Sequence, residues 1–233
     1  MEEVVGINPE PAQSKYYEVT TNAKAYYTKA IIIATGSCPT ELGIPGEAEL
    51  RGKGVSYCAT CDGPLFKDKD IVVIGGGNTA VGEAVYLTRF VRGLTLVHRR
   101  DNLRATKILQ ERLLNNKKVE IKWNCVATEI LGSGRVNGIK IRDVKTGKEE
   151  EILANGVFIF AGIKPNTDFL KGKIELDDKG FIITKENMET SMPGIFACGD
   201  ARKNMLKQVI TSCAEGAQAA HSCAHYIESL LKD

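Results

Sequence analysis

Apolar residues along the chain fall into many short runs and a few longer stretches with helical spacing. The short runs predict β-strands over 16–21, 26–35, 71–74, 94–97, 119–123, 127–131, 136–144, 150–153, 157–160, 181–184 and 194–197. Small or apolar residues recur every three to four positions over 79–90, 105–115 and 210–231, which predicts helices there. The runs 31–34, 71–74 and 157–160 are apolar throughout, as in parallel strands buried on both faces. The pattern predicts an α/β protein.

Composition narrows the classes of function. The 233 residues are 43% hydrophobic and 26% charged, which is ordinary for a globular protein, and the net charge of +2 does not indicate a broad basic face for nucleic acid. No apolar run approaches the roughly 20 residues that a membrane helix needs. The first residues lack the basic and apolar regions of a signal peptide, so we expect a cytoplasmic protein that binds neither nucleic acid nor membrane.

A glycine-rich turn between the strand at 71–74 and the helix at 79–90 predicts a dinucleotide site. In Gly75-x-Gly77-x-x-Ala80, Gly75 permits a tight turn, Gly77 lets the backbone approach a pyrophosphate, and Ala80 lets helix and strand pack closely. A ligand-free turn is the alternative interpretation. The expected cofactor contacts are Gly75, Gly77, Asn78, Thr79 and Ala80.

The next strand ends in His98-Arg99-Arg100, and Arg104 follows one turn later. An NAD site usually has an acidic residue here for the ribose 2′-hydroxyl, whereas arginine suits the 2′-phosphate of NADPH. We therefore expect His98, Arg99, Arg100 and Arg104 to bind NADPH. The alternative is a solvated basic loop.

Cys58-Ala-Thr-Cys61 is followed at once by Asp62. This spacing favours a lowered thiolate pKa and rapid cycling between dithiol and disulfide, and Asp62 is a candidate acid/base beside the pair. Asp62 as a helix-surface carboxylate is the alternative. A zinc site needs two more ligands, but the chain has three histidines and no second Cys-x-x-Cys, so we predict no metal. The other five cysteines are expected to be buried small hydrophobes.

Because a disulfide is reduced by thiolate attack and nicotinamide transfers hydride, the two sites need an intermediary, usually a flavin. At this point the chain resembles the low-molecular-weight thioredoxin reductases of bacteria and archaea. The matching motifs follow the family's order over nearly the whole chain: Ala34-Thr35-Gly36, Cys58 to Gly63, Gly75 to Ala80, His98 to Asp101 with Arg104-Ala105, Gly194 to Asp200, and Gln208 to Thr211.

The resemblance implies a fold of the pyridine nucleotide-disulfide oxidoreductase type, in which an NAD(P)-binding Rossmann-like domain is inserted in the remainder of a FAD-binding Rossmann-like domain. The expected segments are a residual FAD-domain segment at 1–52, an NADPH-binding domain with the redox cysteines at 53–163, and a C-terminal FAD-domain segment at 164–233. The glycines near 52–54 and 162 are expected hinges between the domains.

The implied activity is NADPH-dependent, flavin-mediated reduction of the disulfide of thioredoxin, or of a similar small protein, by a homodimer. In that reading Cys61 faces the flavin, Cys58 attacks the partner disulfide, and Asp62 is the acid/base. The implied FAD contacts are Thr35, Gly36, Gly199, Asp200, Gln208 and Val209.

The chain departs from the family in one respect that affects function. Relatives carry a second Gly-x-Gly-x-x-Gly near the N-terminus, which opens the FAD domain, and this chain has a single fingerprint. We therefore expect this chain alone to bind FAD weakly or not at all. The alternatives are a flavin-free, truncated NADP(H)-binding or thiol-sensing module and a flavin-dependent reductase of a different acceptor. Gly82 also stands where many relatives have glutamate.

Overall fold

The computed structural model describes residues 2–9 and 16–231. The chain divides into two compact units: unit 1 comprises residues 1–38 and 163–233, and unit 2 comprises residues 39–162. Residues 1, 10–15 and 232–233 of the expected FAD-domain segments lie outside the described part. No helix in the described residues is long and apolar enough to cross a membrane.

Unit 2 contains a five-stranded parallel sheet with the strand order β6-β13-β7-β8-β9. Its strands are β6 (Val55–Ser56), β7 (Asp70–Ile74), β8 (Gly93–His98), β9 (Val119–Trp123) and β13 (Gly156–Ile159). Its helices are α1 (Ala59–Asp62), α2 (Asn78–Leu87) and α3 (Lys107–Leu114), with the 3-10 helix η1 (Gly63–Phe66) after α1. Val73 of β7 stands opposite Leu96 of β8 and Phe158 of β13, so the three most apolar strands are neighbours.

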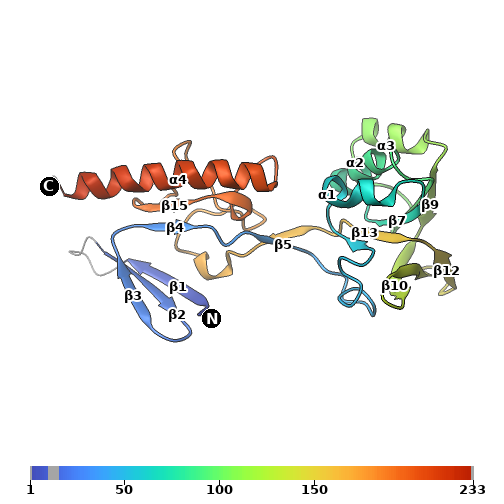
Figure 1. The fold of residues 1–233 in the computed structure, drawn as a ribbon, viewed down its shortest axis with the longest axis horizontal. Coiled ribbons are helices and arrows are strands. Elements are labelled where there is room, and N and C mark those ends of the chain that lie inside the picture. The colour runs from blue at the N-terminus through green and yellow to red at the C-terminus, as the bar shows by residue number, and fades with distance from the viewer. Residues whose placement is uncertain (1, 10–15, 232–233) are drawn as a thin grey trace. The chain divides into compact units, whose positions relative to one another are not determined.

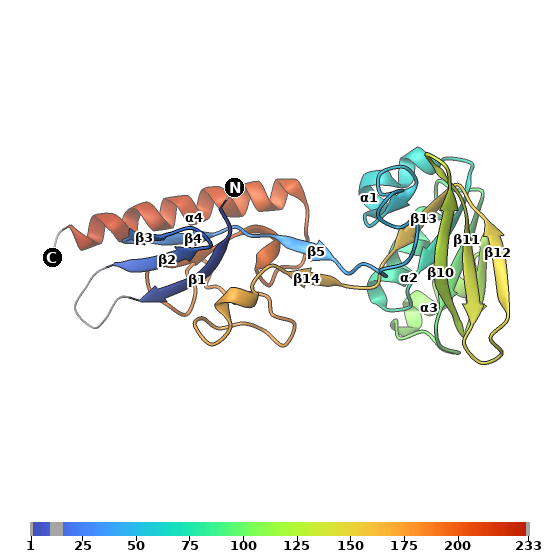
Figure 2. The same ribbon diagram turned by 90° about the horizontal axis from the view of Figure 1, so that it is seen from below.

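A second sheet of unit 2 is antiparallel, with the order β10-β11-β12 (Figure 2). Its strands are β10 (Cys125–Gly132), β11 (Val136–Asp143) and β12 (Glu149–Leu153). Successive residues of β7 alternate between two cores: Ile71 and Val73 pack on the helix side, whereas Val72 and Ile74 pack on the side of β10 and β11. The central sheet is therefore the middle layer of unit 2, with helices on one face and the antiparallel sheet on the other (Figure 1).

Residues 39–54 belong to unit 2, although the sequence-based expectation places 39–52 in the residual FAD-domain segment. Leu50 is buried in the core beside β10 and β11, and the Ile130 amide donates to the Pro45 carbonyl at 2.9 Å. A Cβ on Gly54 would lie 2.6 Å from Cβ of Val136. The boundary between the units therefore falls after residue 38 and not at residue 52, and Gly54, an expected hinge, is packed inside unit 2.

Unit 1 is built around a parallel pair of strands, β4 (Ile31–Ile33) and β15 (Ile195–Ala197). The long helix α4 (Val209–Leu230) lies along one side of this pair, and the antiparallel sheet β1 (Val4–Pro9), β2 (Tyr17–Thr21), β3 (Ala25–Thr28) lies on the other (Figure 1). The short strands β5 (Ser37–Pro39) and β14 (Ile163–Pro165) pair with each other, and the 3-10 helices η2 (Asp168–Leu170) and η3 (Gly199–Ala201) complete the elements.

Two predicted strands differ from the structure. The run 26–35 forms two strands, β3 and β4, which belong to separate sheets. Residues 181–184 form no strand; Ile182 makes only isolated bridges to Leu176 and Arg202. Phe181 and Ile182 are nevertheless buried, at 8% and 0% exposure. The apolar run therefore reflects burial in the core of unit 1 rather than membership of a β-sheet.

Candidate active site

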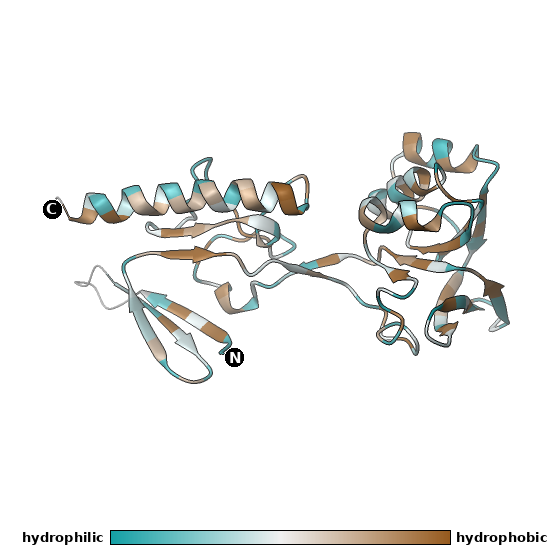
Figure 3. Cartoon of the chain, viewed as in Figure 1, coloured by the Kyte–Doolittle hydropathy of each residue, from teal (hydrophilic) through white to brown (hydrophobic). Residues whose placement is uncertain are grey.

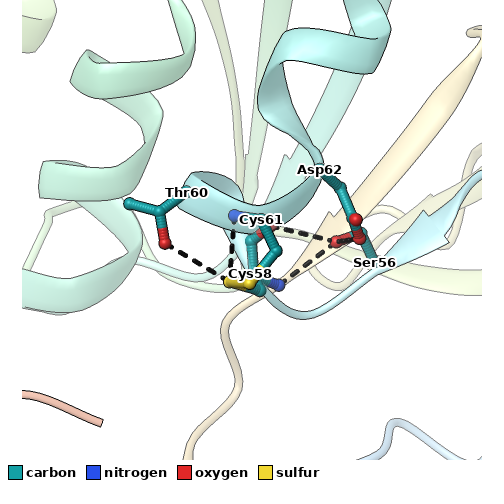
Figure 4. Close-up of a disulfide and its surroundings, with 5 residues drawn as sticks. All are labelled: Ser56, Cys58, Thr60, Cys61 and Asp62. Carbon is teal, nitrogen blue, oxygen red and sulfur yellow. Dashed lines mark hydrogen bonds between the residues drawn. A yellow bond between two sulfur atoms is a disulfide. The ribbon is translucent and has the colours of Figure 1, made fainter. Parts of the chain in front are cut away.

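The two redox cysteines lie where β6 gives way to α1 in unit 2. Cys58 is the N-cap residue of α1 and forms a disulfide with Cys61, their Cα atoms being 5.3 Å apart (Figure 4). The Cys61 amide lies 3.2 Å from Cys58 Sγ, and the Thr60 hydroxyl lies 3.4 Å from the same sulfur. Cys61 is exposed and Cys58 is half-buried. The disulfide is therefore accessible, and two polar groups at Cys58 Sγ favour its thiolate when the pair is reduced.

Asp62 is held beside the disulfide by Ser56, the last residue of β6. The Ser56 hydroxyl donates to Asp62 Oδ2 at 2.6 Å and accepts from the Cys58 amide at 3.1 Å (Figure 4). Ser56 is 4% exposed, whereas Asp62 is half-buried. One buried hydroxyl thus links the carboxylate to the backbone of the cysteine motif.

The glycine-rich turn follows β7 and leads into α2. A Cβ on Gly75 would lie 2.5 Å from Ala80 Cβ and 2.9 Å from the Phe160 carbonyl oxygen, so strand and helix meet closely there. Gly77 is the N-cap of α2; it supplies no side-chain cap, and a Cβ at this position would meet nothing within 4 Å. The start of α2 therefore presents backbone amides to open space, which suits a phosphate group.

The strand β8 and the loop after it are attached to this turn and to the start of α2 at three points. The Gly75 amide donates to the Val97 carbonyl at 3.2 Å, and the Arg104 amide donates to the Gly76 carbonyl at 2.8 Å. The Asn78 side chain accepts from the Thr106 amide at 2.8 Å. These bonds fix the loop beside the start of α2.

The cationic residues of this loop are differently placed. Arg99, Arg100 and Arg104 are exposed, and none of their guanidinium groups forms an ion pair or hydrogen bond with another described residue. His98 is only 4% exposed; its Nε2 is 2.9 Å from the Asn102 carbonyl, and burial lowers its pKa. The ring lies so close to Gly76 that a Cβ there would be 2.3 Å from its Nδ1. The arginines are thus available to an anion, whereas His98 supports the turn from inside.

In unit 1, the expected flavin contacts cluster at the carboxyl ends of β4 and β15. Ile33 stands opposite Ala197 in the parallel pair, so Thr35-Gly36 and Gly199-Asp200 leave the sheet at the same edge. Asp200 Oδ1 accepts from Ser212 of α4 at 3.3 Å, which brings the start of that helix to this edge.

The start of α4 is apolar and uncovered (Figure 3). Val209 and Ile210 are 80% and 75% exposed, and Gln208 is the N-cap residue, joined in a capping box with Thr211. Ligands of open parallel sheets bind beyond the carboxyl ends of the strands, so this edge is a candidate site for an extended cofactor.

Comparison with known proteins identifies the family. The profile of the family described as pyridine nucleotide-disulphide oxidoreductase matches residues 1–216. Thioredoxin reductase of Peptoclostridium acidaminophilum is 49% identical over 214 residues, which are 89% of this chain and 68% of that protein. Thioredoxin reductase of Bacillus subtilis is 46% identical over 217 residues, 93% of this chain and 69% of that protein. This chain belongs to the thioredoxin reductase family.

A solved thioredoxin reductase structure agrees with this assignment. The crystal structure of the Streptococcus pyogenes enzyme matches 98% of this chain and 74% of its own with a TM-score of 0.90 and 45% identity. The fold expected for a thioredoxin reductase, with a parallel sheet of the pyridine nucleotide-disulfide oxidoreductase type, is thereby confirmed. Thioredoxin reductases generally use FAD and NADPH, and which residues of this chain serve them is a separate question.

Sequence reasoning missed three residues that organise the candidate site: Ser56, Asn102 and Thr106. Each acts through a hydrogen bond to a residue already singled out, namely Asp62, His98 and Asn78. Thr106 is the N-cap residue of α3, so a capping signal was available for it, whereas no such signal marks Ser56 or Asn102. The expectation of five buried cysteines was wrong for Cys38 and Cys213, which are exposed.

Proposed function

We propose that this chain is an NADPH-dependent thioredoxin-disulfide reductase that works through a flavin and the Cys58–Cys61 pair. The observation that carries the proposal is the accessible disulfide whose neighbouring carboxylate, Asp62, is fixed by buried Ser56. Family membership supports thioredoxin as the substrate, because the relatives are named for it.

NADPH fits the glycine turn of unit 2. The open position at Gly77 lets a pyrophosphate reach the amides at the start of α2, with Asn78 and Thr79 exposed in its first turn. Arg99, Arg100 and Arg104 supply unpaired cations for the 2′-phosphate. His98 would act beneath the turn rather than on the nucleotide itself.

FAD fits the edge of unit 1 described above, where Thr35, Gly36, Gly199 and Asp200 would hold its polar part. Gln208 and Val209 would lie against its ring, at a helix N-terminus that favours negative charge. When bound, the flavin accepts hydride from NADPH and passes two electrons to the disulfide. A Cβ on Gly199 would lie 3.3 Å from Ser212 Oγ, so the backbone at Gly199 packs closely against the start of α4.

The cysteines and Asp62 account for the thiol half of the reaction. The Cys58 thiolate attacks one sulfur of the thioredoxin disulfide and forms a mixed disulfide, while the other thioredoxin sulfur leaves as a thiolate and takes a proton. The Cys61 thiolate then attacks Cys58 Sγ, which restores the Cys58–Cys61 disulfide and releases the second thioredoxin thiolate. Asp62 is the proposed proton donor for a departing thiolate.

The test follows NADPH consumption with oxidised thioredoxin as acceptor, with and without added FAD. With FAD supplied in large excess to offset weak binding, we expect turnover that depends on FAD, and no turnover in Cys58→Ser or Cys61→Ser. NADPH binding, measured by calorimetry, should be the same in both variants as in the unchanged chain. Cys213→Ser is the matched control, because that cysteine is exposed and is not among the proposed redox or cofactor contacts.

The same measurements separate the proposal from a flavin-free NADP(H)-binding or thiol-sensing module. Turnover that persists in Cys61→Ser contradicts the relay. NADPH binding without any turnover, even when FAD is present, favours the flavin-free module. FAD binding itself is read from the flavin absorbance that stays with the protein after gel filtration.

A further inference from the structure

Two histidines share an exposed face of α4 in unit 1. His221, His225 and Glu228 follow one another at spacings of four and three residues, so they lie above each other on one side of the helix. All three are exposed. Ala219 and Cys223 pack with Phe196 of β15 on the opposite side of the helix, because each lies two residues, or about 200°, from a histidine. The histidine face therefore points away from the core of unit 1.

The two imidazole rings point their outer nitrogens at each other. His221 Nε2 and His225 Nε2 are 3.2 Å apart, and the rings are nearly perpendicular, with centroids 4.4 Å apart. Two nitrogens that bind one metal ion at about 2.0–2.1 Å, with an angle of about 90–110° at the metal, are about 2.9–3.4 Å apart. The observed separation lies within that range. The side chains thus already have the spacing of a chelating pair.

Glu228 supplies the outer contact that metal-binding histidines usually have. Its Oε2 lies 3.5 Å from His225 Nδ1, on the side of the ring opposite to Nε2. A carboxylate beside Nδ1 is the kind of outer partner that orients a metal-binding histidine ring, so that its Nε2 faces the ion. The geometry of the carboxylate and that of the ring pair are independent observations that point to the same kind of ligand.

We propose that His221 and His225 bind one divalent transition-metal cation of the kind that prefers imidazole, Zn²⁺, Ni²⁺ or Cu²⁺, with Glu228 as the positioning residue. No group of three or more potential ligands in the described part of the chain is placed to hold a metal, so water completes the coordination. The bound ion joins successive turns of α4 and stabilises that helix by mass action. The site is separate from the redox chemistry of unit 2 and does not depend on the proposed function.

The test titrates the untagged, oxidised chain with Zn²⁺ by calorimetry and with Cu²⁺ by electron paramagnetic resonance. We expect one ion per chain and a Cu²⁺ spectrum with two nitrogen couplings. His221→Ala and His225→Ala should each weaken Zn²⁺ binding at least tenfold and remove one nitrogen coupling. Glu228→Gln should cause a smaller loss, because it keeps both ligands. Both alanines are exposed and favour helix, so circular dichroism should show α4 intact.

Exposed thiols also bind these metals, so the control is a variant with Cys38→Ser and Cys213→Ser. Its Zn²⁺ affinity should equal that of the unchanged chain. Equal binding in the two histidine variants, or loss of the site in the cysteine control, overturns the proposal. If the two rings only form a hydrogen bond with each other, neither the unchanged chain nor any variant will bind Zn²⁺ one-to-one. That result also overturns the proposal.

Discussion

Removing the Ser56 hydroxyl should weaken both the fold of unit 2 and the proposed acid/base. Ser56→Ala deletes the donor to Asp62 Oδ2 at 2.6 Å and the acceptor of the Cys58 amide at 3.1 Å. It leaves the methyl group of alanine in a site that is 4% exposed. The main consequence is therefore the loss of two hydrogen bonds rather than a change in packing.

The magnitude follows from the two bonds. A hydrogen bond to a carboxylate contributes about 1.5–3 kcal/mol and a neutral one about 0.5–1.5 kcal/mol to the free energy of unfolding. Asp62 is half-buried, so water replaces part of the stronger bond. We expect Ser56→Ala to lower the free energy of unfolding by about 2 kcal/mol. A freely rotating Asp62 should also reduce thioredoxin turnover about tenfold, which corresponds to about 1.4 kcal/mol in the barrier.

Urea unfolding followed by Trp123 fluorescence measures the stability of unit 2 selectively, because the chain has one tryptophan and it lies in β9. Ser133→Ala is the matched control: its serine is an exposed loop residue of unit 2, and its effect should stay within about 0.5 kcal/mol. The reasoning is refuted if the two variants unfold at the same urea concentration. If Ser56→Ala lowers the stability but leaves turnover unchanged, the stabilising role of Ser56 stands and the proposed acid/base role of Asp62 is refuted.

Three further variants test other parts of unit 2. Replacing Arg99 and Arg100 by alanine should weaken NADPH binding tenfold or more, because each lost hydrogen bond to the phosphate costs about 1.5–3 kcal/mol. Calorimetry should show NADH binding unchanged. Arg112→Ala, which also removes an exposed arginine, is the control. Buried Glu47 accepts hydrogen bonds at 2.8–3.0 Å from three donors, the Leu42 and Gly43 amides and the Tyr57 hydroxyl. Glu47→Gln, which presents an amide donor to them, should therefore cost about 2–3 kcal/mol in urea unfolding. Burial lowers the pKa of His98 below 6.5, so the unfolded chain binds a proton that the folded chain does not, and stability should fall as pH drops below about 6.5. His98→Gln should reduce that slope, and equal slopes would contradict it.

The parts of the fold that the sequence predicts are those with a strong local pattern. The runs in β7 and β13 are apolar throughout, and each becomes a buried strand of the central sheet. Residues 39–54 lack such a pattern, and their place in unit 2 depends on contacts with β10 and β11 far along the chain. Burial of Phe181 and Ile182 without a β-ladder shows the converse, because an apolar run records burial and does not specify a pairing partner.

The candidate site divides in the same way. Cys58, Cys61 and Gly75 were found because their function depends on spacing within a few residues. Ser56 is six residues from Asp62, and Thr106 is 28 residues from Asn78, so their hydrogen bonds exist only once the units have folded. Groups that orient the reacting residues, such as the Ser56 hydroxyl and the Thr106 amide, are thus harder to predict from the sequence than the reacting residues themselves.

The three consecutive glycines of the turn show why a motif alone does not assign roles. A side chain at position 75 would collide with Ala80 and the Phe160 carbonyl, and a side chain at position 76 would collide with the His98 ring. Glycine is therefore needed at both positions for packing inside the protein. Gly77 alone borders open space, so only there does the absence of a side chain serve something outside the protein. A phosphate at Gly77 would therefore bind to a backbone whose shape is already fixed by packing at the other two glycines, and His98 would support that backbone from beneath the turn.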